Sequence, residues 1–202
     1  MNTRLNGKRI AILVAEGFEQ VELLEPKQAL EKAGAEVDIV SAAGATVRAW
    51  DMTKWGKTVR VDVPLKKATP HVYDALLLPG GVMNPDKLRM DKRAVDFVRA
   101  FFDQKKPVAA ICHGPWTLIE ADVVRGRRMT SWPSLQTDLR NAGAEWVDEQ
   151  VVVDDGLVTS RKPADLPAFN RMVIQEFAQQ NQREFVTVQG AHPLASSGAA
   201  YP

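Results

Sequence analysis

The chain has 202 residues, 45% of them hydrophobic, which is enough to bury the core of one domain but cramped for two. Its formal net charge of +1, with 25% charged residues, does not favour nucleic acid or an acidic membrane surface as a standing partner. A single cysteine excludes an intrachain disulfide and a multi-cysteine metal site.

The first residues indicate the cytosol. Residues 1–9 are polar and basic, and the apolar run 10–15 is too short for a signal sequence or a membrane span. We therefore expect a cytoplasmic protein without a membrane partner, in which a thiol stays reduced and usable.

The chain begins with alternating strand and helix patterns. The apolar run 9–15 predicts a strand that is buried on both faces. A helix is predicted from about Glu19 to a stop at Gly34, with Pro26 either kinking it or marking the start of its main part. A second strand is predicted at 37–40.

The middle of the chain predicts a hairpin, two core strands and a helix between them. Two tryptophans and alternating valines indicate a hairpin-like excursion over 47–63. The runs 73–78 and 107–111 predict buried strands, and Asp91 between them can cap a helix with an apolar face.

The last third repeats the pattern more weakly. A helix is predicted from His113 to about Asp122, and a second helical face is closed by Gly143. Next comes a hairpin with an Asp-Gly turn at 155–156. A long helix follows over 166–179.

Strands that alternate with helices predict a doubly wound α/β domain, in which helices cover both faces of a mainly parallel sheet. We assign this domain to residues 8–180 and expect 181–202 to be a tail that is extended or partly disordered. In such a sheet, ligands bind outside the carboxyl ends of the strands. Three motifs follow predicted core strands and should meet there: 16–22, 79–81 and 111–115.

Cys112 ends an apolar strand at a predicted sharp turn into a helix, since Ala110 and Gly114 beside it are small. Free backbone N–H groups and the positive end of a helix dipole lower the pKa of a thiol at such a turn. We expect strained backbone there. A buried cysteine that only fills space is the alternative, and the turn favours the reactive thiol.

His113 is the best candidate for a base near this thiol. Adjacent helix residues do not face each other, so His113 can reach the sulfur only if the turn swings it across. Its alternative role is a polar residue at a helix start. Gly80 and Gly81 would let main-chain N–H groups approach a ligand, as an oxyanion hole with the His113 N–H requires, or they form a simple loop.

Two acidic candidates, Glu19 and Glu22, are three residues apart and share a helix face. A glutamate beside a thiol would share a proton with it, whereas two solvated glutamates at a helix N-terminus are also favourable. Asp86, which follows an Asn-Pro pair, is predicted from local sequence to be a turn or cap residue.

These motifs resemble those of the ThiJ/PfpI superfamily, and of its PfpI-like branch in particular. The resemblance spans residues 8–178 and rests on three stretches: Glu-Gln-Val-Glu at 19–22, Leu-Pro-Gly-Gly at 78–81 and Ala-Ile-Cys-His-Gly-Pro at 110–115. It implies a flavodoxin-like α/β/α sandwich, similar to class I glutamine amidotransferases, with a cysteine nucleophile elbow.

The resemblance also implies roles for single residues. Cys112 matches the family nucleophile, His113 its neighbouring histidine, and Glu22 the glutamate that contacts the sulfur. Glu19 matches the other acidic residue of that segment. Three glycines are assigned to oxyanion or substrate binding: Gly80, Gly81 and Gly114.

Asp86 matches a family residue that orients the histidine across a subunit interface. In this chain it stands one position further from the glycine pair and is Asp instead of Glu. If Asp86 has this role, the protein must be at least a homodimer, because two chains would share the site.

The implied activity is that of a stress-response, cysteine-dependent hydrolase or lyase acting on reactive carbonyls, glycated proteins or peptides. The alternative is a non-enzymatic redox sensor or chaperone-like protein that uses oxidation of Cys112. His113 and Asp86 favour the enzyme, since a sensor needs no proton-shuttling base. A glutamine amidotransferase is disfavoured, because the downstream His192 lies in the predicted tail. No nucleotide-binding or zinc motif is present, so we expect neither a cofactor nor a metal.

Overall fold

A computed structural model describes residues 4–189, and for 180–189 it describes the backbone alone. Its centre is a seven-stranded sheet with the order β10-β11-β7-β6-β1-β2-β5. The strands are β1 (Arg9–Leu13), β2 (Glu36–Ser41), β5 (Val63–Pro64), β6 (Ala75–Leu78), β7 (Val108–Ile111), β10 (Val151–Asp154) and β11 (Leu157–Ser160). Every neighbouring pair is parallel except β10 and β11, which confirms the mainly parallel sheet.

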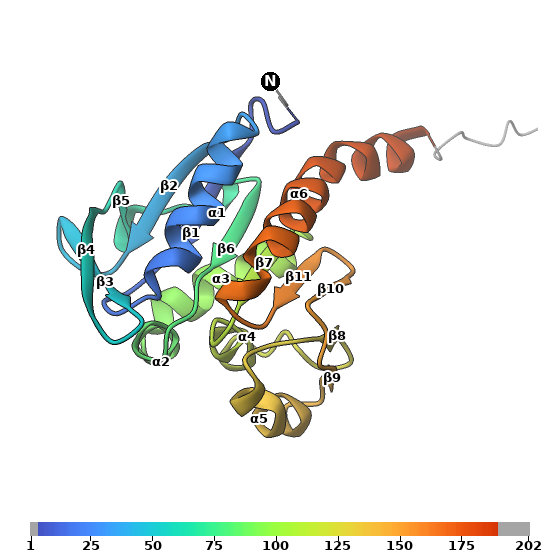
Figure 1. Cartoon of the computed structure of the whole chain (residues 1–202). Coiled ribbons are helices and arrows are strands. Elements are labelled where there is room, and N and C mark those ends of the chain that lie inside the picture. Colours follow the sequence, from blue (N-terminus) through green and yellow to red (C-terminus); the bar gives the residue numbers. More distant parts are fainter. Residues whose placement is uncertain (1–3, 190–202) are drawn as a thin grey trace, which may run out of the picture.

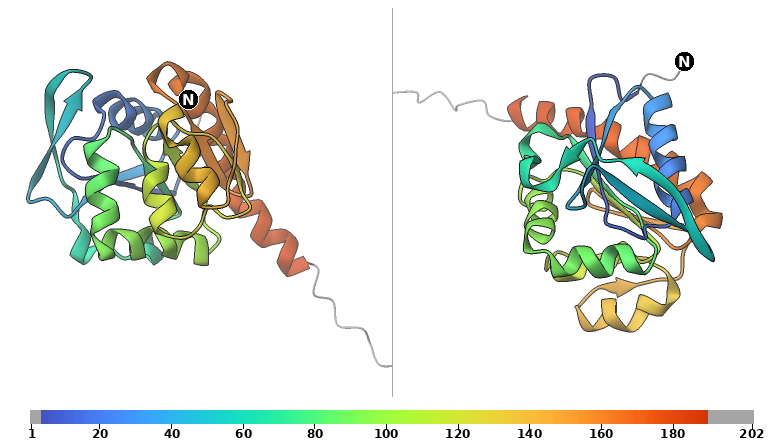
Figure 2. Two further views of the ribbon diagram at one scale, coloured as in Figure 1. Left: turned by 90° about the horizontal axis from the view of Figure 1, so that it is seen from below. Right: turned by 90° about the vertical axis from the view of Figure 1, so that its left-hand side faces the viewer.

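Helices cover both faces of this sheet, as the doubly wound fold predicts (Figures 1 and 2). The helices are α1 (Gln20–Lys32), α2 (Met83–Met90), α3 (Lys92–Asp103), α4 (Pro115–Glu120), α5 (Gln136–Asn141) and α6 (Leu166–Gln189). α1 and α6 lie together on one face, and α3 and α4 lie on the other with α2 beside them.

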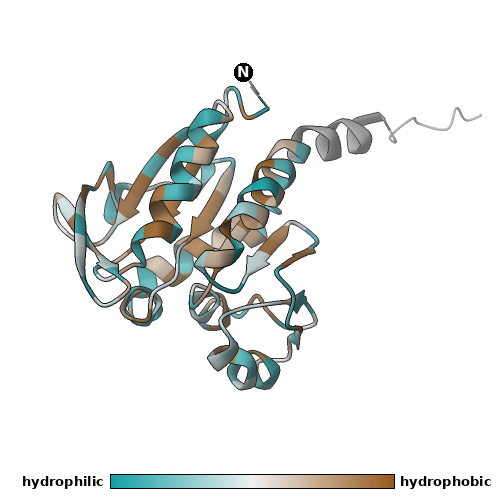
Figure 3. Cartoon of the chain, in the orientation of Figure 1, coloured by the Kyte–Doolittle hydropathy of each residue, from teal (hydrophilic) through white to brown (hydrophobic). Residues whose placement is uncertain are grey.

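Strand β1 shows why its sequence is apolar after Arg9, the partly exposed residue at its start. Ile10 and Ile12 belong to the core under α1 and α6, whereas Ala11 and Leu13 belong to the core under α3 and α4. Successive side chains of a strand point to opposite faces, so a strand covered on both sides has no polar position. Figure 3 shows the result as brown strands inside helices whose outer faces are teal.

Smaller elements decorate the sheet. The hairpin of β3 (Thr46–Asp51) and β4 (Lys54–Arg60) lies outside it, at the left in Figure 1. β8 (Arg128–Met129) and β9 (Glu145–Trp146) pair next to α5. Four short 3₁₀ turns complete the described chain: 65–67, 70–72, 133–135 and 163–165. Within residues 4–189, no helix is long and apolar enough to cross a membrane.

Three local predictions differ from the structure, two of them in one of their alternatives. Asp86 is not in a turn: it lies in the first turn of α2, a helix that the Asn-Pro pair before Asp86 concealed. Pro85 is tolerated there because an N–H in the first turn has no helical acceptor. Pro26 does not mark a helix start, since α1 runs through it from Gln20 to Lys32. The other alternative, a kink at Pro26, stays a prediction.

The third difference concerns the tail, which was expected to be extended or partly disordered. α6 continues to Gln189, so the residues 181–189 of the predicted tail are helical and not extended. Residues 190–202, the rest of that predicted tail, lie outside the described residues.

The strand order places the expected crevice. β1 lies between β2 and β6, so the chain winds outward from β1 in both directions. In doubly wound sheets, ligands bind at this switch point, outside the carboxyl ends of the strands. The segments that follow β1, β6 and β7 meet there, as the sequence predicts.

Candidate active site

Cys112 lies on a strained elbow directly after β7. Its φ of 62° is in the left-handed region, which costs a residue with a side chain about 1–3 kcal/mol. Two backbone hydrogen bonds hold it: its N–H donates to the Ser160 carbonyl at 3.0 Å, and its carbonyl accepts from the Trp132 N–H at 2.9 Å. A Cβ on Gly114 would lie 2.6 Å from the Leu78 carbonyl oxygen, so glycine is required where α4 begins. The predicted strained elbow is confirmed.

The elbow turns His113 onto the thiol. Its Nδ1 lies 3.2 Å from the sulfur of Cys112. The imidazole stacks on Trp132, with ring centroids 5.8 Å apart, and meets Trp116 edge-on at 5.3 Å. Burial lowers the pKa of His113 to about 4, so the ring is neutral near pH 7 and can accept a proton.

The other ring nitrogen of His113 has a partner that the sequence did not reveal. Its Nε2 lies 3.4 Å from the hydroxyl of Ser134, in the 3₁₀ turn 133–135. This segment is about twenty residues away along the chain and has no helical or strand periodicity. The backbone bond from Trp132 to Cys112 brings it back to the elbow.

Glu22 is fully buried in the first turn of α1, and its Oε2 accepts a hydrogen bond from the Gly80 N–H at 2.8 Å. Burial raises the pKa of Glu22 to about 8, although the Gly80 N–H and the Cys112 thiol act in the opposite direction. A Cβ on Gly80 would lie 2.5 Å from Glu22 and 2.6 Å from Cys112, so the three residues are in direct contact. Glu22 therefore carries a proton at neutral pH beside the sulfur.

Two backbone N–H groups point at the sulfur. The pKa of the Cys112 thiol is raised overall, contrary to the lowering expected from the turn: burial raises it most and an ionised Glu22 would raise it further, whereas hydrogen bonds from the Gly81 and His113 N–H groups lower it. Gly81 has a φ of 79°, which favours glycine. The Gly80 N–H, which we expected in an oxyanion hole, is instead donated to Glu22.

Glu19 lies at the N-cap of α1 and is half-buried at the edge of the same site. Burial raises the pKa of its carboxyl, against a hydrogen bond from the Met52 N–H. Its own N–H donates to the Gly80 carbonyl at 3.2 Å. Glu19 and Glu22 thus bring two carboxyl groups of raised pKa to one place.

Asp86 lies apart from this group. It is exposed on α2 and does not line the cleft. Within residues 4–189, no hydrogen bond or ion pair joins Asp86 to His113. Its predicted role across an interface stays a prediction.

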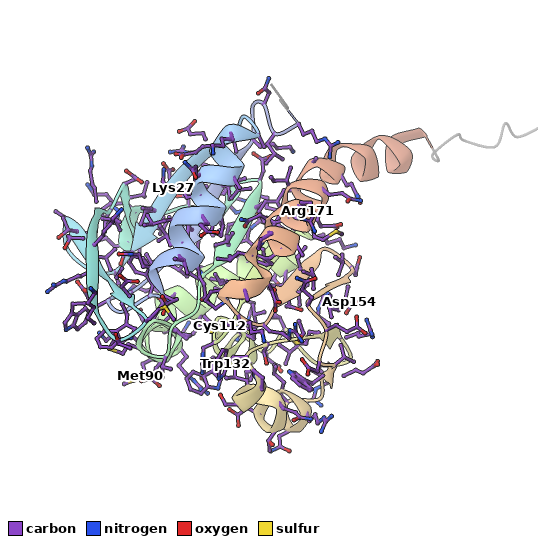
Figure 4. All side chains as sticks on the ribbon, in the orientation of Figure 1. Lys27, Met90, Cys112, Trp132, Asp154 and Arg171 are labelled. Carbon is purple, nitrogen blue, oxygen red and sulfur yellow. The ribbon has the colours of Figure 1, made fainter. Side chains whose placement is uncertain are left out.

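These residues form the floor of a cleft of about 480 Å³. The hairpin, the glycine loop and the segments before α5 and α6 form its walls, which are mainly apolar. Its lining consists of Glu19, Glu22, Trp50, Met52, Thr53, Gly81, Val82, Met83, Cys112, His113, Trp132 and Pro163. Figure 4 labels Cys112 near the lower end of α1, with Trp132 below it. Among the described residues, no three His, Cys, Asp or Glu side chains are grouped to hold a metal ion.

This arrangement suits covalent catalysis. It combines a thiol, a neutral imidazole within hydrogen-bonding distance, two backbone donors at the sulfur and the protonated carboxyl group of Glu22 beside it.

The chain is similar in sequence to known proteins. A family model described as the DJ-1/PfpI family matches residues 8–176. Protein/nucleic acid deglycase 2 of Escherichia coli is 49% identical over 170 residues, which cover 83% of this chain and 96% of that protein. General stress protein 18 of Bacillus subtilis is 46% identical over 167 residues, covering 82% of this chain and 95% of that protein.

A solved structure shares the fold. The crystal structure of Drosophila melanogaster DJ-1beta matches with a TM-score of 0.78 and 26% identity. The match covers 90% of this chain and 96% of that one.

Proposed function

The chain belongs to the DJ-1/PfpI family, and we propose that it is a cysteine-dependent deglycase that acts on reactive carbonyls and on the adducts they form with proteins. The observation that carries this proposal is the 3.2 Å contact between the Cys112 sulfur and the neutral imidazole of His113, at the floor of an open cleft. The name of the Escherichia coli relative supports the reaction class.

The first step moves the thiol proton to Nδ1 of His113 while the sulfur adds to the aldehyde carbon of an α-oxoaldehyde, giving a hemithioacetal. The aldehyde oxygen carries the developing negative charge and accepts hydrogen bonds from the Gly81 and His113 N–H groups. Pre-oriented donors of this kind stabilise the charge without reorganising during the reaction.

The second step isomerises the hemithioacetal. A proton leaves the carbon that carries the sulfur, and a proton is added to the neighbouring carbonyl carbon, which yields the thioester of a 2-hydroxy acid. His113 returns the thiol proton to the oxyanion and then accepts the proton from this carbon, while the protonated carboxyl of Glu22 donates one to the neighbouring carbonyl carbon, because burial raises its pKa to about 8. The proton on His113 then returns to Glu22, and the carboxyl of Glu19, whose pKa burial also raises, lies at the edge of the same site. Water then hydrolyses the thioester and restores the thiol, so the net reaction adds one water to the oxoaldehyde.

The size of the cleft supports adducts on side chains as substrates. A volume of about 480 Å³ exceeds what a three-carbon oxoaldehyde fills and leaves room for the side chain that carries it. The name of the Escherichia coli relative adds nucleic acid as a second carrier to test. The reaction needs a reduced thiol, which supports a cytosolic location.

The role that the resemblance implies for Asp86 needs a second copy of the chain. We therefore propose a homodimer in which Asp86 on α2 of one copy approaches His113 of the other. The exposure of Asp86 supports this proposal, because the carboxylate is free of contacts with its own His113.

The deciding experiment measures lactate released from methylglyoxal, and from a peptide treated with methylglyoxal, by the wild type and by Cys112→Ala. A fluorogenic peptide is assayed alongside. Lactate formation that Cys112→Ala abolishes supports the deglycase. Peptide cleavage without lactate formation would overturn the proposed deglycase function and indicate a peptidase instead.

A second candidate, a redox sensor, is favoured by one observation: the protonated Glu22 lies against the sulfur and can donate a hydrogen bond to an oxidised form of it. It would be adopted if neither assay shows turnover that depends on Cys112. Mass spectrometry after mild peroxide treatment would then have to show oxidation of Cys112. The oxidised fraction would have to be smaller when Glu22 is replaced by Leu.

A further inference from the structure

Asn84 is a fully buried polar residue that none of the roles above includes. It lies in the first turn of α2, behind the glycine loop. Its Oδ1 accepts a hydrogen bond from the Ala15 N–H at 2.7 Å, and its Nδ2 donates to the Pro79 carbonyl at 2.8 Å and to the Gly80 carbonyl at 3.2 Å. One donor and two acceptors surround it, so the orientation of the amide is fixed by its partners.

These bonds join two segments of the crevice. Ala15 lies two residues after the end of β1, and Pro79 and Gly80 begin the loop that follows β6. The Gly80 N–H then reaches Glu22, and the next N–H, that of Gly81, reaches the Cys112 sulfur. Asn84 therefore fixes the carbonyl side of the same peptides whose N–H groups face the reacting centre.

The loop needs such an anchor because it contains two consecutive glycines. Glycine has wide backbone freedom, so the Gly80–Gly81 peptide can rotate unless its carbonyl is held. The Glu19 N–H also donates to the Gly80 carbonyl, at 3.2 Å, but it belongs to a different segment. The amide of Asn84 is the side chain that bonds two successive carbonyls of the loop.

We propose that Asn84 is a positioning residue, which holds the Gly80–Gly81 peptide so that the Gly81 N–H meets the Cys112 sulfur and the oxyanion that forms beside it. The oxyanion part of this role rests on the proposed deglycase reaction. The thiol part does not, because the Gly81 N–H faces the sulfur whether or not the chain turns over a substrate.

Two variants separate the donor from the acceptor. Asn84→Asp has the same shape and keeps an acceptor for the Ala15 N–H, but it places an oxygen against two carbonyls. Asn84→Leu removes both functions. Tyr73→Phe is the matched control: it deletes another buried hydrogen bond, to Asp38 at 3.0 Å, next to the amino end of β6 and far from the sulfur.

The readout that a purely structural role would not move is the pH dependence of Cys112 alkylation by iodoacetamide, measured on the folded protein. We expect the midpoint to rise by roughly 0.5–1 pH unit in both Asn84 variants, the effect of one lost hydrogen bond to a thiolate. Tyr73→Phe should lower the melting temperature and leave the midpoint unchanged.

Turnover adds a second readout. With methylglyoxal as substrate, kcat should fall about 10-fold to 100-fold in the Asn84 variants while KM stays within about twofold, because the lost interaction forms in the transition state. Variants that melt earlier but keep the wild-type alkylation midpoint would overturn the proposal. If the wild type shows no turnover at all, the deglycase fails and the alkylation midpoint still decides the role of Asn84.

Discussion

The Nδ1 nitrogen of His113 lies 3.2 Å from the sulfur of Cys112, although the two residues are neighbours in the chain. Adjacent side chains on a helix diverge, so this contact cannot form within α4. It forms because Cys112 has a φ of 62° and α4 begins only at Pro115, which leaves His113 outside the helix. A base and its nucleophile are thus supplied by two consecutive residues.

This contact predicts that His113→Ala separates catalysis from oxidation. Loss of a proton acceptor costs turnover roughly 100-fold to 10,000-fold. Peroxide still reaches the sulfur, so oxidation of Cys112 should change by only a few-fold, as mass spectrometry can measure. Equal losses of turnover and of oxidation would show that His113 acts by holding the elbow and not by moving protons.

The elbow predicts different costs for two glycines. Gly114→Ala would bring a Cβ within 2.6 Å of the Leu78 carbonyl and 3.0 Å of the Ile111 carbonyl, so we expect a loss of about 1–3 kcal/mol in the free energy of unfolding. Gly44→Ala is the control, because nothing lies within 4 Å of its added Cβ. It should stay within about 1 kcal/mol of the wild type. Urea unfolding measures both, and equal stabilities would contradict the close packing.

Glu22 predicts a pH dependence of stability. Its pKa is about 8 in the folded chain and 4.5 ordinarily, so between these values the folded state binds a proton that the unfolded state has released. Stability of the wild type therefore falls as pH rises through this window, by up to about 1.4 kcal/mol per pH unit. Glu22→Gln cannot ionise and lacks this fall.

The measurement is the difference in free energy of unfolding between Glu22→Gln and the wild type, which should shift in favour of the variant from pH 4.5 to 8. The lowered pKa of His113 acts in the opposite sense, adding stability as pH rises from about 4 to 6.5, but it is present in both proteins and cancels. Parallel pH profiles would mean that Glu22 ionises normally.

Ser134 predicts a smaller effect on catalysis. Its hydroxyl lies 3.4 Å from Nε2 of His113 and the residue is exposed, so Ser134→Ala should leave the melting temperature unchanged. The loss of one orienting hydrogen bond should lower kcat about 2-fold to 10-fold. An unchanged kcat would remove Ser134 from the site.

Asp86 predicts complementation between inactive chains. In the proposed homodimer, a mixture of Cys112→Ala and Asp86→Asn chains contains hybrid dimers with one intact site. Refolding the two variants together should restore about a quarter of the wild-type activity. If the mixture is no more active than Asp86→Asn alone, the site is not shared.

The strands of the sheet were predictable because burial on both faces leaves a plain pattern. β6 and β7 are apolar at every position and β1 at every position after Arg9, and the runs at 9–15, 73–78 and 107–111 located them. The elbow at Cys112 was predictable for a related reason: only small neighbours fit where a strand turns into a helix.

Other features left no local signal. The Asn-Pro-Asp stretch that begins at Asn84 has the chemistry of a turn, yet it lies in the first turn of α2, which begins at Met83, because a proline fits a first helical turn. Ser134 and Trp132 reach His113 through a tertiary contact. No periodicity in the sequence of their segment predicts this contact. The burial of Glu22 was likewise invisible, since glutamates at a helix N-terminus are usually solvated.

The β3–β4 hairpin has a consequence for how this family can diverge. It lies outside the seven-stranded sheet and is attached to the segment after β1, through bonds between Gly17 and Arg48 at 2.9 Å and between Trp50 and Phe18 at 2.7 Å. Yet Trp50, Met52 and Thr53 form one wall of the cleft. The reactive groups and this wall of the cleft therefore come from separate segments of the chain. Mutations in the hairpin can change the shape of the cleft, and with it the substrate preference, while the sheet keeps Cys112 in its strained conformation.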